Sequence, residues 1–322
     1  MRILVTGGAG FIGAYLAEYL IDKGDEVWVI DNLSTGRRDN LRRIINKPEM
    51  RLLEGDVAEA GVVDELVSQV DVVYHLAASV GVKKIVGNLV ESITNNVVGT
   101  ETVLAAAAKY KKKVLLTSTS EVYGRDSQQP FKESDDLRMG PPEKTRWSYA
   151  CGKALDEYLA LAYYYERSLP VVIVRLFNTV GERQTSDYGM VLPTFARQAW
   201  QGEELTIHGD GRQSRCFCHV SDVVRALAGL MAYERAIGQV FNVGSSEEIT
   251  IEDLADKVLQ ITGSKAEKVY VPYEKAYTKS FDDITRRVPS IDKVREVIGW
   301  QPTLGLDEIV QRVVAYERVS AR

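Results

Sequence analysis

The chain has 322 residues, 45% hydrophobic and 26% charged, and its 45 acidic and 40 basic side chains give a net charge of −5. This length suits about two domains with a sizeable core, whereas the acidic balance argues against a surface that binds nucleic acid or anionic lipid. We expect a cytoplasmic protein without a metal, because the N-terminus leads straight into a predicted strand, no apolar run nears the roughly 18 residues of a membrane span, and the three cysteines lack disulfide or zinc spacing.

The first half of the chain alternates short Val-, Ile- and Leu-rich runs with helix-length segments. We predict strands at 3–6, 27–30, 51–54, 72–75, 114–117 and 171–176. The intervening helices are predicted at 11–23, 62–69, 85–111 and 147–167. Buried strands linked by helices form a parallel sheet that is covered on both faces. The prediction is therefore an α/β fold, a doubly wound parallel sheet of the Rossmann type, with an NAD-binding domain over residues 1–177.

The pattern after residue 177 is less regular. Helices are predicted near 192–201, 221–232, 251–262 and 307–316, among short strands and turns. We read residues 178–322 as a smaller α+β substrate domain. A strand-like run at 240–243 is expected to return to the main sheet, so that a segment near 220–245 interleaves the two domains. The polar stretch 128–142 contains three prolines and is predicted to be a loop over the site.

A glycine-rich loop lies between the first strand and the first helix. Gly7, Gly10 and Gly13 have the spacing G-x-x-G-x-x-G, and in this context they let a pyrophosphate approach the backbone at a helix N-terminus. Asp31 ends the second strand, where a carboxylate accepts hydrogen bonds from the adenosine ribose and repels a 2′-phosphate. We therefore predict NAD as the cofactor. Further cofactor contacts are expected from Phe11, Ile12, Asn32, Asp56, Val57, Leu76, Ala77 and Ala78.

A tyrosine and a lysine mark the predicted catalytic helix. Tyr149 and Lys153 are four residues apart and so share one helix face. An ammonium beside a phenol is expected to lower the pKa of the phenol. Thr119, Ser120 and Glu121 follow the fifth strand, at the sheet edge where ligands bind, although these hydroxyls could also serve only to cap the turn. Together the motifs suggest hydride transfer at a carbon that bears a hydroxyl, with Tyr149 moving the proton.

In this order, the motifs resemble the extended short-chain dehydrogenase/reductases that modify nucleotide sugars. The resemblance extends over nearly the whole chain and includes the segments 175–178 and 215–220. It implies that Thr119 hydrogen-bonds the sugar 4-hydroxyl, that Tyr149 removes its proton, and that Lys153 binds the nicotinamide ribose. It also implies that the substrate is a UDP-sugar, which we expect to contact Asn178, Val191, His208, Arg215 and Arg287.

Several reactions can follow oxidation at C4 of the sugar. Thr119-Ser120-Glu121 lacks the aspartate of the Thr-Asp-Glu segment in dTDP-glucose 4,6-dehydratases, which disfavours dehydration. The same segment, with 146–149 and 283–289, resembles UDP-glucuronate decarboxylases, in which Arg287 would face the sugar carboxylate. The stretch 216–218 and the short C-terminal half resemble bacterial UDP-sugar 4-epimerases.

We predict an NAD-dependent UDP-sugar 4-epimerase that acts on UDP-glucose and UDP-galactose or on UDP-glucuronate and UDP-galacturonate. UDP-glucuronate decarboxylase is the alternative. An NDP-sugar 4,6-dehydratase and an NAD-binding regulator without turnover are less favoured.

The resemblance further implies a homodimer. The helices predicted at 85–111 and 147–167 are long and carry more apolar residues than one sheet face needs, among them Leu104, Leu155, Leu159 and Tyr163. Pairing of these helices with their copies would form a four-helix interface. The expected partners are a UDP-sugar and a second copy of the chain, with neither nucleic acid nor membrane.

Overall fold

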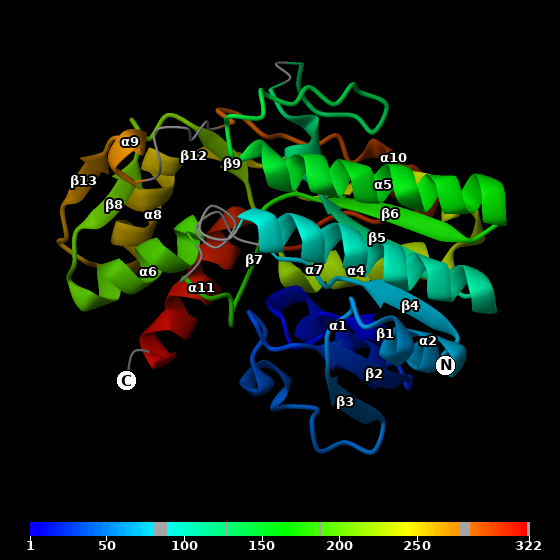
Figure 1. The fold of residues 1–322 in the computed structure, drawn as a ribbon. Coiled ribbons are helices and arrows are strands. Elements are labelled where there is room, and N and C mark those ends of the chain that lie inside the picture. The colour runs from blue at the N-terminus through cyan, green and yellow to red at the C-terminus, as the bar shows by residue number, and fades with distance from the viewer. Residues whose placement is uncertain (80–88, 126–127, 187–188, 277–283, 321–322) are drawn as a thin grey trace.

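A parallel sheet of seven strands forms the centre of the computed structural model, which describes residues 1–322 except 80–88, 126–127, 187–188, 277–283 and 321–322 (Figure 1). Its strand order is β11-β6-β5-β4-β1-β2-β3, and each neighbouring pair is parallel. The strands are β1 (Arg2–Thr6), β2 (Glu26–Asp31), β3 (Met50–Glu54), β4 (Val72–His75), β5 (Lys113–Thr119), β6 (Val171–Leu176) and β11 (Gln239–Val243). The predicted doubly wound fold is therefore confirmed.

Helices cover both faces of this sheet because alternate strand residues point to opposite sides. In β1, Ile3 and Val5 join one buried cluster, whereas Leu4 joins the other. The first cluster involves the helices α1 (Phe11–Asp22), α7 (Val220–Ala232) and α10 (Asp292–Ile298). The second involves α2 (Ala60–Ser68), α4 (Leu89–Tyr110) and α5 (Trp147–Arg167). Residues 85–88 of the helix predicted at 85–111 lie outside the described part of the chain.

The strand order reverses between β1 and β4. The chain leaves β1 through α1 on one face of the sheet, and it leaves β4 toward α4 on the other face. In open parallel sheets, such a switch point leaves a crevice outside the carboxyl ends of the strands, where ligands bind. The glycine loop after β1 and the hydroxyl-rich segment after β5 both lie at this edge.

A smaller group of elements adjoins one end of the sheet (Figure 1). Its core lies between α6 (Val191–Gln201), α8 (Ile251–Thr262) and α11 (Leu306–Ser320). Three two-stranded sheets accompany it: β7 (Thr179–Val180) with β10 (Cys218–His219), β9 (Ser214–Cys216) with β12 (Glu248–Thr250), and β8 (Leu205–His208) with β13 (Lys268–Val271). The remaining short elements are α9 (Tyr273–Ala276) and the 3₁₀ turns η1 (Arg38–Leu41), η2 (Ser120–Tyr123) and η3 (Glu234–Ala236). The domain boundary between residues 177 and 178 stays a prediction.

One expectation about the exposed helix faces is wrong. Leu104 is fully buried in the sheet-facing core of α4, so it has no surface to offer to a second copy. Leu159 and Tyr163 are partly buried against the same core, whereas Leu155 and Tyr158 on α5 are 50% and 67% exposed.

None of the described helices combines the length and hydrophobicity needed to cross a membrane.

Candidate active site

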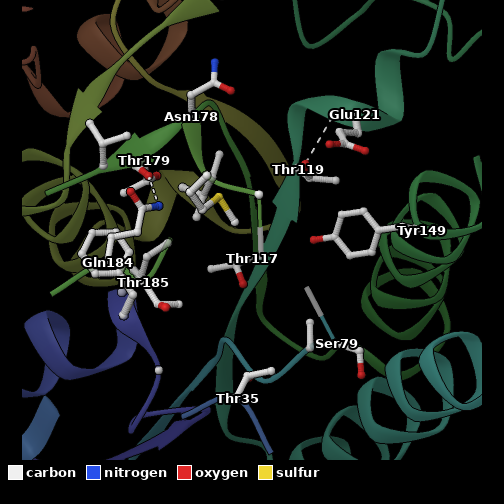
Figure 2. Close-up of a pocket in the computed structure, with 18 of the residues that line it drawn as sticks. Thr35, Ser79, Thr117, Thr119, Glu121, Tyr149, Asn178, Thr179, Gln184 and Thr185 are labelled. Carbon is white, nitrogen blue, oxygen red and sulfur yellow. Dashed lines mark hydrogen bonds between the residues drawn. The ribbon is translucent and has the colours of Figure 1, made fainter. Parts of the chain in front are cut away.

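A cavity of about 680 Å³ lies at the switch point of the sheet. It brings together every residue that the sequence suggested for the site. These residues are Gly7, Gly10, Phe11, Ile12, Asp31, Asn32, Asp56, Val57, Leu76, Ala77, Ala78, Thr119, Ser120, Glu121, Tyr149, Lys153, Asn178, Val191, His208, Arg215 and Arg287. Thr119, Glu121 and Tyr149 lie on one side of the view in Figure 2, and Asn178 lies on the other. Their individual roles stay predictions.

The glycine loop fits a dinucleotide. Gly7 has φ +68°, and a Cβ at this position would come within 2.8 Å of the Ala77 backbone, so the end of β1 approaches the end of β4 more closely than a side chain would allow. Gly10 precedes α1 and provides no side-chain cap for the helix. The backbone N–H groups of the first helical turn and the helix dipole therefore remain available to a pyrophosphate.

Asp31 is held rigidly at the end of β2. Its carboxylate accepts hydrogen bonds from the backbone N–H of Ala9 at 2.9 Å and of Leu33 at 2.8 Å. Burial raises the pKa of this carboxyl group, and the backbone donors oppose that shift. The carboxylate oxygens have further lone pairs for ribose hydroxyls. An acceptor fixed at this position suits the ribose of NAD.

The pKa of Tyr149 does not shift in the direction expected from the neighbouring Lys153. Its hydroxyl points into the cavity, toward the space between Thr117 and Thr119 (Figure 2). The pKa of Tyr149 is raised rather than lowered, first by burial and then by the negative charges of Glu121 and Asp156. The ammonium of Lys153 donates a hydrogen bond to Asp156 at 2.9 Å. The Asp156 carboxylate offsets the charge of Lys153, and the spacing of Tyr149 and Lys153 alone did not predict it.

Thr119, at the end of β5, both caps the following turn and lines the cavity. Thr119 Oγ1 accepts the backbone N–H of Glu121 at 3.3 Å, so the capping function considered for these hydroxyls is present. Thr119 also lines the cavity beside Tyr149 (Figure 2). The threonine can therefore hold the turn in shape and still offer its hydroxyl group to a ligand.

Two arginines flank Glu121. Its Oε1 lies 3.5 Å from Arg287 Nη1 and 3.6 Å from Arg146 Nη2. Arg287 Nη1 is also 3.5 Å from the hydroxyl of Ser120. The side chains of Arg146 and Arg287 are 5% and 11% exposed. Two cations and one anion leave a net positive charge in this part of the cavity, which favours an anionic ligand.

Buried ionic contacts fix the catalytic helix against the sheet. Arg175 on β6 forms a bidentate pair with Glu157 on α5, with contacts of 3.0 and 2.7 Å. Ser118 on β5 donates to the same carboxylate at 2.5 Å. Because these bonds tie α5 to both strands, they set the position of Tyr149 relative to Thr119.

The opposite wall of the cavity comes from later segments of the chain. Asn178 Nδ2 donates to the Cys216 carbonyl at 3.1 Å, and Arg215 Nη1 donates to the Ser214 carbonyl at 2.8 Å. The cavity is also lined by Gln184, Arg197 and Gln213. No spacing pattern in the sequence marks these residues, because they are isolated polar side chains in separate segments. Within the described ranges, no cluster of three or more His, Cys, Asp or Glu side chains could hold a metal ion.

Comparison with known proteins gives one family and a consistent set of relatives. The family model described as GDP-mannose 4,6 dehydratase matches residues 4–313. The chain is 42% identical to the UDP-N-acetyl-alpha-D-glucosaminuronate decarboxylase of Bacillus cytotoxicus over 96% of its length and 97% of the relative. It is 38% identical to UDP-glucuronic acid decarboxylase 1 of Arabidopsis thaliana, over 98% of its own length and 69% of that protein.

Among solved structures, the fold resembles a UDP-glucuronic acid 4-epimerase from Bacillus cereus in complex with UDP-glucuronic acid and NAD. The TM-score is 0.89 at 28% identity, over 99% of this chain and 100% of that one. The sequence relatives are decarboxylases and this structural relative is an epimerase, so the comparisons agree on nucleotide-sugar chemistry. The structural relative supports NAD as the cofactor. The comparisons favour the decarboxylase alternative over the predicted 4-epimerase.

Proposed function

The chain belongs to the GDP-mannose 4,6-dehydratase family, within the NAD-dependent extended short-chain dehydrogenase/reductases, and we propose that it decarboxylates a UDP-linked hexuronate. The substrate class is UDP-glucuronate or its 2-acetamido counterpart. The observation that carries this proposal is Arg287, which lies in the cavity beside Ser120 and Glu121. A guanidinium at this position can bind the C6 carboxylate of a uronate. The two decarboxylase relatives support the same assignment.

The first step is oxidation of the C4 hydroxyl. In its phenolate form, Tyr149 takes the proton from this hydroxyl, while Thr119 holds the oxygen by a hydrogen bond. NAD⁺, which the glycine loop and Asp31 would hold, would supply the hydride acceptor for the oxidation of C4 and the donor for its later reduction. The ionic contacts between α5 and the sheet keep Tyr149 and Thr119 on the same side of the sugar.

The resulting ketone at C4 activates the carboxylate, because C6 is then in the β-position to a carbonyl group. The C5–C6 bond breaks, its electron pair moves toward the C4 oxygen, and carbon dioxide leaves. Tyr149 is now protonated and donates a hydrogen bond to the oxygen that gains negative charge. A proton from solvent then adds at C5, and when C4 is reduced again, Tyr149 returns its proton to the C4 oxygen. The net change is the release of carbon dioxide and the uptake of one proton at C5.

A 4-epimerase acting on UDP-glucuronate is the second candidate, and the likeness to the Bacillus cereus enzyme favours it. Such an enzyme would use the same tyrosine and threonine, and Arg287 would bind a carboxylate that stays in place. Incubation with UDP-glucuronate in deuterated water separates the two reactions. Decarboxylation gives a lighter product with one deuterium at C5, whereas 4-epimerisation leaves the carbon skeleton and the C5 hydrogen unchanged.

The protein is further proposed to work as a homodimer. Val90, Ile93 and Val98 on α4 are exposed, as are Leu155 and Tyr158 on α5. These two helices pack against each other on one face of the sheet (Figure 1). Their exposed apolar side chains would be covered by the same two helices of a second copy.

A further inference from the structure

The partner of Lys153 is a second carboxylate inside the catalytic helix. Asp156 lies three residues after Lys153 on α5, and its Oδ2 is 2.9 Å from the ammonium nitrogen. The two side chains are 0% and 3% exposed. We propose that Asp156 is a positioning residue: it orients the ammonium of Lys153 and offsets the positive charge that Lys153 presents to Tyr149.

This ion pair differs from an ordinary pair on a helix surface. Exposed pairs at this spacing add only a few tenths of a kcal/mol to helix stability. Removing both charges from water is expensive, and apolar residues of similar size often stabilise a core as well or better. Glu157, the next residue, is bound to Arg175 and Ser118 and so cannot take the place of Asp156. Stability alone therefore gives little reason for a carboxylate at position 156.

Among the described residues, the negative charges of Glu121 and Asp156 both raise the pKa of Tyr149. Asp156 lies on α5, the same helix as Lys153. Glu121 lies on η2, where the positive charges of Arg146 and Arg287 flank it.

Behind Lys153, His75 on β4 is fully buried, between Thr6 at 2.7 Å and Thr100 at 3.2 Å. Burial and the charge of Lys153 lower the pKa of His75 to about 3, so this ring is neutral at physiological pH. Burial raises the pKa of Asp156, and Lys153 and Thr100 on α4 oppose that shift by stabilising the ionised carboxylate. Of these neighbours, Asp156 therefore supplies the negative charge that balances Lys153.

The arrangement suits a tyrosine that must release a proton and later return it. An ammonium has three donors, and the bond to Asp156 uses one of them, which fixes the direction of the others. With its charge partly offset, Lys153 stabilises the phenolate less strongly, so Tyr149 regains its proton more readily. The arrangement would serve any substrate whose C4 hydroxyl is oxidised and then restored, whether or not that substrate is decarboxylated.

The test is a pH titration of Tyr149 in the NAD⁺-bound protein without sugar. Tyrosinate absorbance is followed for the protein and for Tyr149→Phe, and the difference isolates this residue. Asp156→Asn should lower the midpoint by about one pH unit, the order expected for one charge roughly 10 Å away at an effective dielectric constant of about 20. An unchanged or raised midpoint in folded protein overturns the proposal.

Asp222→Asn is the matched control. Asp222 is also buried, but it lies on α7 at the other face of the sheet and is hydrogen-bonded to Thr303. Its replacement should leave the titration of Tyr149 unchanged, and a shift equal to that of Asp156→Asn would overturn the inference. Asp156→Ala repeats the test if the asparagine variant does not fold. Because no sugar is present, the result is independent of whether the chain decarboxylates UDP-uronates.

Discussion

Replacement of Arg287 by alanine should weaken the binding of UDP-glucuronate far more than that of UDP-glucose. Arg287 lines the cavity, and its side chain is only 11% exposed, so solvent screens its charge weakly. A charge-assisted hydrogen bond from this guanidinium to the substrate carboxylate is worth about 1.5–3 kcal/mol. This corresponds to a loss of affinity of about ten- to a hundredfold.

The effect on Glu121 adds to this loss. In the variant, Glu121 keeps Arg146 at 3.6 Å as its ionic partner but loses Arg287. The substrate carboxylate would then enter beside a carboxylate with less compensating charge, which disfavours binding further. UDP-glucose has no carboxylate, so its affinity should change by less than about threefold.

Calorimetric titration of the NAD-bound protein measures these affinities. All proteins carry Tyr149→Phe, so that no ligand is turned over during the measurement. Arg286→Ala is the matched control, because this neighbouring arginine is 49% exposed and pairs with Glu248 at 2.8 Å outside the cavity. Equal losses for UDP-glucuronate, UDP-glucose and UDP would refute the reasoning, since Arg287 would then be a phosphate ligand.

Three further variants test the rest of the site and the assembly. Tyr149→Phe should lower turnover by about 10²- to 10⁴-fold while NAD stays bound, because the base is lost; product formation near the wild-type rate would exclude Tyr149 as that base. Asp31→Ala should lower the affinity for NAD and reduce the difference in affinity between NAD and NADP, as measured by fluorescence titration. Equal affinity of the unmodified protein for the two cofactors would contradict this role. Lysines at Leu155 and Tyr158 should convert a dimer into monomers in light scattering, and a monomeric unmodified protein would rule the interface out.

The architecture of the sheet could be predicted because its signals are local. The strands β1, β2, β4, β5 and β6 contain continuous apolar runs, since both of their faces are largely buried, whereas the edge strand β3 has no buried residue. The helix α5 begins and ends where its sequence pattern predicted it. The glycine loop and Asp31 were found because their spacing from the first two strands is set by the fold.

The electrostatics of the site could not be predicted in the same way. Glu121, Arg146 and Arg287 come from three distant segments, and only the folded chain brings them together. Asp156 is three residues from Lys153, a spacing typical of solvent-exposed helix pairs, and only its packing against the sheet shows that it is buried. The pKa of Tyr149 therefore moved in the opposite direction to the one inferred from the lysine alone.

The most direct test of the proposed function follows the fate of the C6 carbon. UDP-glucuronate labelled with ¹³C at C6 is incubated with the NAD-bound protein, and the gas phase and the nucleotide sugars are analysed by mass spectrometry. The same experiment is repeated with the labelled 2-acetamido substrate. We expect that the label from at least one substrate appears in carbon dioxide and that the sugar product is an unlabelled UDP-pentose. Label that stays in UDP-sugars of unchanged mass with both substrates would contradict it.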